Sequence, residues 1–163
     1  MKQTKTLLII SCGKKKTREL QTQKVRASAA YIGPMFQVIQ KAKREGRWNP
    51  NLFLGIVSAK YGFLRSTDLI EDYDLKMTTK LAKKLNPQVI QEITKWNMEE
   101  KFDLIYVLMG KTYLKATEGL ETQLDVEVIV ENMGGLGVGQ QKLVRFLEKF
   151  SKMKILDNFL TWE

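Results

Sequence analysis

Four short runs rich in apolar residues, separated by longer amphipathic stretches, shape the pattern of this chain. The runs occupy residues 6–12, 52–58, 103–109 and 126–131. Apolar runs of this length, bounded by polar residues, are typical of strands that are buried on both faces of a parallel sheet. We therefore predict four β-strands at these positions.

The stretches between the runs carry apolar residues at helical spacing. This spacing covers residues 27–44, where Gly33-Pro34 can begin a second helix, and it recurs at 79–98 and 111–122. A further helix should follow a glycine-rich loop at 134–139, while 59–78 forms a long polar connection. The tail, 155–163, fits either a short strand or a docked segment.

Strands that alternate with helices predict an α/β fold, because each helix carries the chain back to start the next parallel strand. We expect a single three-layer domain over residues 1–163, with a mainly parallel four-stranded central sheet. In such sheets ligands bind at the carboxyl ends of the strands. The residues that follow each predicted strand are therefore the first candidates for a site.

Glycine, with a hydroxyl, amide or lysine side chain nearby, follows each of the four strands. The candidates are Ser11, Gly13 and Lys14, then Ser58 and Lys60, then Gly110, Lys111 and Tyr113, and finally Gly134, Gly135 and Gly137. Lysine ammonium groups and glycine-rich turns at helix starts both bind phosphate. We expect these residues to converge on one phosphate- or nucleotide-binding pocket. For the last three glycines, a tight strand-to-helix turn is the alternative interpretation.

The charge of the chain favours a polyanionic partner. Its 163 residues include 27 Lys+Arg and 18 Asp+Glu, which gives a formal net charge of +9. We expect binding to nucleic acid, DNA rather than RNA, or to a nucleotide. A lysine- and glutamate-rich surface of the thermophilic kind is the alternative source of the charge. No apolar run approaches the ~20 residues of a membrane span, so we expect no membrane partner. The single cysteine favours a reducing compartment, so we expect a cytoplasmic protein.

Two residue counts exclude whole classes of chemistry. The chain has no histidine and a single cysteine, Cys12. Hydrolases that use Ser-His-Asp or Cys-His groups, HExxH metalloproteases, structural zinc sites and iron–sulfur clusters are therefore excluded. We expect no metal and no cofactor. Acid–base chemistry must come from carboxylates, lysine, tyrosine or the lone thiol.

Four carboxylates lie close together in the predicted polar connection. They are Asp68, Glu71, Asp72 and Asp74. Without histidine, carboxylates are the best general bases, and partial burial can tune their pKa toward neutrality. We favour Asp74, then Asp72, as catalytic groups. A solvated acidic loop that pairs with nearby lysines is the alternative.

Three tyrosines complete the set of candidate site residues. Tyr61 follows the second strand and is a third candidate catalytic group, which could donate a proton or stack on a base. A structural tyrosine capping the sheet is an equally ordinary role. Tyr31 and Tyr73 are candidates to stack on a nucleic-acid base.

Several of these motifs resemble a known family. They are Leu8-Ile9-Ile10-Ser11, Tyr31-Ile32-Gly33, the stretch VSAKYGFLR at 57–65, Asp68-Leu69-Ile70 with Tyr73, and the stretch GKTYLK at 110–115. Together they resemble the YaaA-type peroxide-stress proteins and, still more, a small family from bacterial and phage genomes with a CGK…SAKYGLL pattern. The resemblance covers roughly residues 6–140.

That resemblance implies an association with DNA and with protection from damage. It also implies a relation to the α/β superfamily of uracil-DNA glycosylases and to archaeosine-type base-modifying domains. The histidine that uracil glycosylases place after their last strand has no counterpart here, because the chain has none.

The combined expectation is a nucleic-acid-binding domain that processes a base or nucleotide. The favoured reaction is hydrolysis of the N-glycosidic bond in damaged or modified DNA. The alternative is a non-catalytic DNA- or nucleotide-binding protein of a stress or phage-defence type. The oligomeric state stays open at this point.

Overall fold

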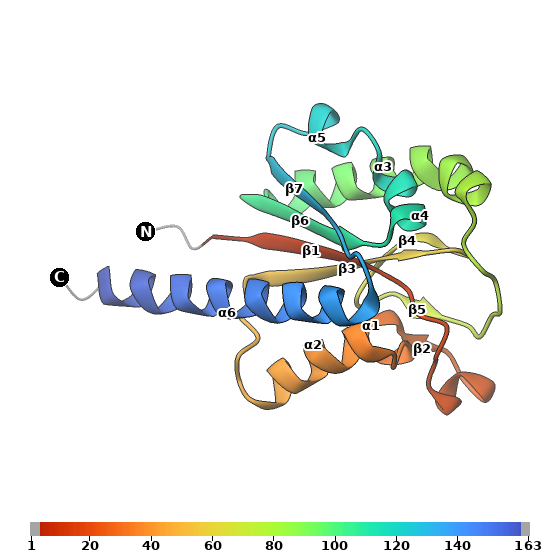
Figure 1. The fold of residues 1–163 in the computed structure, drawn as a ribbon, viewed down its shortest axis with the longest axis horizontal. Helices are drawn as coiled ribbons and strands as arrows, with labels where there is room; N and C mark the ends of the chain where they lie inside the picture. Colours follow the sequence, from red (N-terminus) through yellow and green to blue (C-terminus); the bar gives the residue numbers. More distant parts are fainter. Residues whose placement is uncertain (1–3, 161–163) are drawn as a thin grey trace.

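A five-stranded sheet with the strand order β4-β3-β1-β6-β7 forms the centre of the molecule in the computed structural model (Figure 1). The structure describes residues 4–160, with side chains up to residue 151. The strands are β1 (Thr6–Ser11), β3 (Leu52–Ser58), β4 (Gly62–Arg65), β6 (Leu104–Met109) and β7 (Glu127–Asn132). All neighbouring pairs are parallel except β3 and β4. The four predicted strands and the mainly parallel sheet are thus confirmed.

The predicted count of four strands is wrong, because β4 adds a fifth at one edge. It folds back on β3 as an antiparallel hairpin, and its Phe63 and Leu64 side chains are buried. Two apolar residues are too few to show a strand pattern within a polar stretch. The same stretch contains β5 (Leu69–Ile70), which pairs with β2 (Val25–Arg26) in a small second sheet.

The predicted helices are confirmed in three places and divided in a fourth. A break at Gly33 separates α1 (Ala27–Ala30) from α2 (Pro34–Arg44), and α3 spans Thr79–Glu100. The stretch 111–122 is not one helix but α4 (Lys111–Leu114), the 3₁₀ helix η2 (Lys115–Thr117) and α5 (Leu120–Gln123). Gly119, with a positive φ of 89°, makes the turn before α5. A second 3₁₀ helix, η1, spans Arg18–Gln21.

The last helix begins earlier and runs further than the sequence predicts. Helix α6 spans Leu136–Leu160, so Gly137 lies in its first turn and not in a loop. The tail is helical up to residue 160, where a strand or docked segment was expected, and 161–163 lie outside the described residues.

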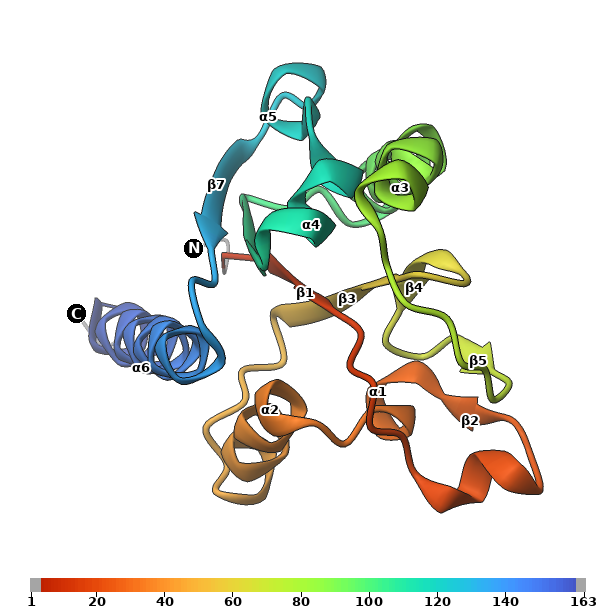
Figure 2. The same ribbon diagram turned by 45° about the vertical axis from the view of Figure 1, so that its right-hand side comes forward.

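Helices cover both faces of the sheet and create two separate cores (Figure 2). Because side chains alternate along a strand, Leu8 and Ile10 of β1 pack with α1, α2 and α6 on one face. Leu7 and Ile9 point to the other face, where α3 contributes Ile93 among other buried residues. Because both faces of β1 are buried, its sequence is a continuous apolar run.

The chain path creates a switch point between β1 and β6. After β1 the chain passes to β3 on one side, and then it returns through α3 to β6 on the other side of β1. At such a point the connections leave the carboxyl ends of the two strands in opposite directions, so a crevice opens between them. No helix in the described part of the chain is long and apolar enough to cross a membrane.

Candidate functional site

A cavity of about 580 Å³ lies at the carboxyl ends of β1 and β6, at the switch point. We call it the carboxyl-edge cavity. Its lining comes from three segments: Cys12, Gly13, Lys14 and Lys16 after β1, Gly110 to Tyr113 after β6, and Tyr73 to Met77. The last five residues belong to an irregular stretch, residues 71–77, which runs from β5 toward α3 (Figure 2). We call this stretch the wall segment.

The lining of this cavity is strongly basic. The lining contains four lysines, Lys14, Lys16, Lys76 and Lys111, and a single carboxylate, that of Asp74. Between the described residues, the ammonium groups of Lys14, Lys76 and Lys111 make no hydrogen bond or ion pair. The surplus of unpaired positive charge makes the cavity suited to an anionic ligand.

Lys16, by contrast, is already engaged with Tyr73. Its Nζ donates a hydrogen bond of 2.8 Å to the Tyr73 carbonyl oxygen and lies 4.3 Å from the centre of the Tyr73 ring. A cation over an aromatic face is an attractive contact. Lys16 therefore ties the loop after β1 to the wall segment.

One side of the cavity carries a thiol and a phenol in contact. The Cys12 side chain is 9% exposed, and its Sγ lies 3.2 Å from the Tyr113 hydroxyl oxygen. Burial, followed by the nearby Cys12, raises the pKa of Tyr113 well above its ordinary value. The phenol therefore stays protonated at neutral pH and can act as a hydrogen-bond donor.

Beside the cavity, three hydroxyl groups form a buried cluster. The Tyr73 hydroxyl oxygen lies 2.6 Å from that of Tyr31 and 2.9 Å from Ser58 Oγ. Tyr31 is 1% exposed and Ser58 is fully buried. Burial raises the pKa of Tyr31 to about 12, and it also raises the pKa of Tyr73. All three groups are thus neutral hydroxyls that satisfy one another.

Ser58 has this place because it ends β3 and starts the hairpin turn. Its Oγ accepts hydrogen bonds from the backbone N–H groups of Lys60 and Tyr61, each at 3.2 Å. Serine commonly stabilises turns through such local bonds. The same oxygen that shapes the turn therefore also holds Tyr73.

Tyr61 supports the wall segment and does not line the cavity. Its hydroxyl oxygen accepts a 2.9 Å hydrogen bond from the Glu71 backbone N–H, and its ring meets the Tyr73 ring edge-on at 5.7 Å. Lys60 is exposed, with Nζ 5.5 Å from the Tyr61 ring centre and 5.9 Å from that of Tyr73.

The structure brings together part of the predicted site. The predicted residues that line the cavity are Gly13, Lys14, Tyr73, Asp74, Gly110, Lys111 and Tyr113. Ser58, Lys60, Tyr61 and Tyr31 stand behind Tyr73, and Ser11 is the last residue of β1. The buried Tyr31 ring packs on Phe36, with centres 5.3 Å apart, so its faces are not open to a base.

The remaining predicted residues lie away from the cavity lining. Gly134, Gly135 and Gly137 follow β7, an edge strand two places from β1, and none of them lines the cavity. Asp72 is exposed, and its carboxylate accepts a 3.0 Å hydrogen bond from the Tyr73 N–H. Three of the four post-strand positions thus meet at the site. The loops after β1 and β6 line the cavity, and Ser58 at the end of β3 binds the hydroxyl of Tyr73, which lines it.

Several lining residues were not among the sequence candidates. They are Cys12, Lys16, Leu75, Lys76, Met77 and Thr112. Cys12 and Thr112 adjoin predicted residues, so the position after each strand was a usable signal. Lys76 and Lys16 are indistinguishable in sequence from the other lysines of this basic chain.

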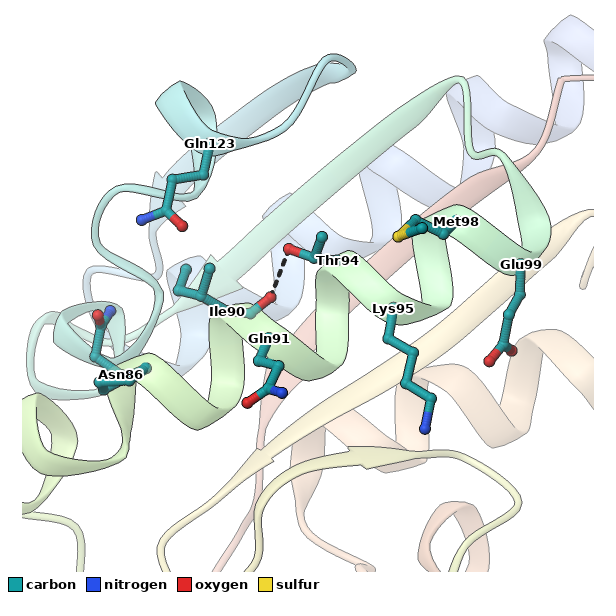
Figure 3. Close-up of a pocket in the computed structure, with 9 residues that line it drawn as sticks. Asn86, Ile90, Gln91, Thr94, Lys95, Met98, Glu99 and Gln123 are labelled. Carbon is teal, nitrogen blue, oxygen red and sulfur yellow. Dashed lines mark hydrogen bonds between the residues drawn. The ribbon is translucent and has the colours of Figure 1, made fainter.

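A second cavity, of about 790 Å³, lies along the outer side of α3 (Figure 3). Asn86, Ile90 and Met98 line it together with Gln123 of α5. The Asn86 side-chain amide donates to the carbonyl oxygens of Ala116 and Glu118, so it holds the α4–α5 connection in place. Amides and apolar groups dominate this lining, so we place the chemistry at the smaller, basic cavity.

The fold and the cavity define an α/β protein with a basic cavity at the switch point of its sheet. A family model described as "Family of unknown function (DUF6884)" matches residues 7–148, so the chain belongs to this family. A UPF0246 protein of Shewanella halifaxensis is 30% identical over 132 residues, which cover 74% of this chain and 48% of that protein. The UPF0246 match confirms the expected relation to YaaA-type proteins.

Two further proteins are similar to this chain. The uncharacterized protein YfjM of Bacillus subtilis is 39% identical over 80 residues, covering 46% of this chain and 49% of YfjM. The crystal structure of AF0587, described as a protein of unknown function, matches 90% of this chain and 44% of its own, with a TM-score of 0.53 and 11% identity. This last likeness shows a shared fold. The chain spans about half the length of the curated relatives that it matches.

Proposed function

We propose that this protein binds nucleic acid, DNA in preference to RNA, through the carboxyl-edge cavity and hydrolyses the N-glycosidic bond of a damaged or modified base. The observation that carries the proposal is the lining of the cavity, which combines four lysines with one carboxylate at the switch point. The relation to uracil-DNA glycosylases that the sequence motifs imply supports the choice of reaction.

The cavity offers two kinds of phosphate contact. Lys14, Lys76 and Lys111 supply ammonium groups that no carboxylate neutralises in the described part of the chain. Gly13 and Gly110 supply open backbone, because a Cβ atom built on either would meet nothing within 4 Å. A phosphate can therefore approach their peptide groups closely, which a side chain would hinder.

Asp74 provides the chemistry in this proposal. Cleavage of a glycosidic bond develops positive charge on the sugar, and a nearby carboxylate can stabilise this charge or orient the attacking water. Asp74 is exposed at the cavity wall, within reach of solvent water. Asp74 shares the cavity lining with Lys14, Lys76 and Lys111, so a nucleotide whose phosphate these lysines hold would place its sugar in the same cavity as the carboxylate.

The direct test is release of free base, or formation of abasic sites, from DNA that carries damaged or modified bases. Asp74→Asn should keep DNA binding while turnover falls ~100-fold, the usual scale for losing an acid–base group. Asp125→Asn is the matched control, because Asp125 is an exposed aspartate that does not line the cavity. If Asp74→Asn retains full turnover, Asp74 is not the catalytic group.

The second candidate is a non-catalytic DNA- or nucleotide-binding module of a stress or phage-defence type. The exposure of Asp74 favours it, because between the described residues no hydrogen bond orients this carboxylate. DNA binding that persists in the double variant Asp72→Asn and Asp74→Asn, with no turnover by any form of the protein, would establish the module.

A further inference from the structure

The wall segment lacks the backbone hydrogen bonds that hold regular elements. Residues 71–77 belong to no helix or strand, and between the described residues no backbone–backbone hydrogen bond involves them. Side chains anchor them instead. Tyr61 binds the Glu71 N–H, Lys16 binds the Tyr73 carbonyl oxygen, and Met77 is buried in the core beside α3.

Tyr73 is the anchor whose side chain contacts two buried hydroxyl groups. Ser58 Oγ already accepts two backbone N–H groups, which occupy both its lone pairs, so its own proton is left for the Tyr73 hydroxyl oxygen. The Tyr31 hydroxyl holds the same oxygen at 2.6 Å. Both partners are buried, so they give the Tyr73 hydroxyl a fixed position.

The ring of Tyr73 is already in contact with other groups. Lys16 Nζ lies 4.3 Å from the ring centre, and Tyr61 meets the ring edge-on. A base that stacked on the face under Lys16 would have to displace this ammonium group. The hydroxyl group of Tyr73 and part of its ring surface are thus occupied by contacts within the protein.

We infer that Tyr73 is a positioning residue, which acts through its hydroxyl by fixing the wall segment so that Asp74 and Lys76 line the cavity. The ring does not serve as a base-stacking surface. The inference rests on the proposed function for what the cavity binds. The anchoring itself rests only on the contacts of the Tyr73 hydroxyl.

Tyr73→Phe separates the two roles, because it keeps the ring and removes only the hydroxyl. A stacking role predicts that Tyr73→Phe binds DNA like the wild type and that only Tyr73→Ala loses affinity. A positioning role predicts that Tyr73→Phe and Tyr73→Ala lose affinity to a similar extent. The probe is a fluorescein-labelled single-stranded DNA, followed by anisotropy at fixed salt.

A second measurement tests the anchoring without any ligand. Trypsin cleavage after Lys76, mapped by mass spectrometry, should become about tenfold faster in Tyr73→Phe, as expected when buried hydrogen bonds no longer oppose local opening. Ser58→Ala removes the partner from the other side and should accelerate the same cleavage. If Tyr73→Phe does not fold, the cleavage rate of Ser58→Ala tests the anchoring in its place.

Tyr106→Phe is the matched control. The Tyr106 hydroxyl donates a 2.6 Å hydrogen bond to Glu131, its ring stacks on Phe146, and it does not line the carboxyl-edge cavity. It should change neither the cleavage after Lys76 nor the affinity for DNA. Unchanged cleavage after Lys76 in Tyr73→Phe overturns the inference, as does wild-type affinity in that variant. If the wild type binds no DNA at all, the proposed function fails, and the cleavage rate alone decides the role of Tyr73.

Discussion

Tyrosine hydroxyls supply much of the hydrogen bonding around the carboxyl-edge cavity. Tyr73 joins Tyr31 and Ser58, Tyr113 contacts Cys12, and Tyr61 binds the backbone of Glu71. Burial raises the pKa of Tyr31, Tyr73 and Tyr113, so these phenols remain protonated donors at neutral pH. The hydrogen bonds that join Tyr73 to Tyr31 and Ser58 therefore do not change between pH 6 and 8, the ordinary range of histidine titration.

The buried Tyr31 makes the stability of the protein sensitive to alkaline pH. Its pKa is about 12 in the folded protein and about 10 in an unfolded chain, so the unfolded state loses the proton first. Stability should therefore fall as pH rises from about 10 to about 12, by about 1.4 kcal/mol per pH unit for this group. Tyr31→Phe should remove that part of the slope. Urea unfolding of both proteins across this range measures the difference, and parallel curves would contradict the argument.

At the scale of elements, the β3–β4 hairpin depends on a glycine for its packing. A Cβ atom at Gly55 would lie 2.6 Å from Cζ of the Phe63 ring, which is buried. Gly55→Ala should overpack this contact and destabilise the protein by about 1–3 kcal/mol.

Gly13→Ala is the control for this substitution, because a Cβ atom there meets nothing within 4 Å. Its thermal midpoint should stay near that of the wild type, although ligand binding at the cavity should weaken. Equal midpoints for Gly55→Ala and the wild type would show that the Phe63 ring moves aside freely.

The elements that sequence could predict are those whose signal is local. Strands β1, β3, β6 and β7 and helices α2 and α3 each carry a long apolar pattern, and each lies where that pattern places it. Strand β4 shows only two apolar residues, and Gly119 interrupts an apparent helix with a positive φ. One or two residues cannot be distinguished from an ordinary loop by a sequence pattern.

The residues of the candidate site also differ in how far the sequence could predict them. Residues that directly follow strands were predictable, because the topology of a parallel sheet brings the carboxyl ends together. The wall segment was predictable only in part. Tyr73 and Asp74 were candidates, but Lys76 was not, since the place of this segment depends on contacts between residues far apart in the sequence. Tyr73 lies 15 residues from Ser58, 42 from Tyr31 and 57 from Lys16. Tyr61 and Tyr31 carry no sequence mark that separates a supporting tyrosine from one that meets a ligand.

At the scale of the whole molecule, the net charge of +9 alone does not locate a binding surface. Lysines are exposed on several elements, including Lys41 of α2, Lys83 of α3 and Lys149 of α6. The proposal makes a narrower claim, that Lys14, Lys76 and Lys111 at the cavity contact phosphate. This claim can be separated from a general attraction between a basic protein and DNA.

The most direct test is the salt dependence of DNA binding, measured by anisotropy between about 50 and 200 mM salt. The triple variant Lys14→Gln, Lys76→Gln, Lys111→Gln should bind DNA more weakly than the wild type. Its slope of log binding constant against log salt concentration should be shallower than that of the wild type by about 2–3, since each lost phosphate contact removes ~0.9. The control triple variant Lys41→Gln, Lys83→Gln, Lys149→Gln loses the same charge and should keep the wild-type slope. Equal losses in both triple variants, or no binding by the wild type at ~50 mM salt, would contradict the account.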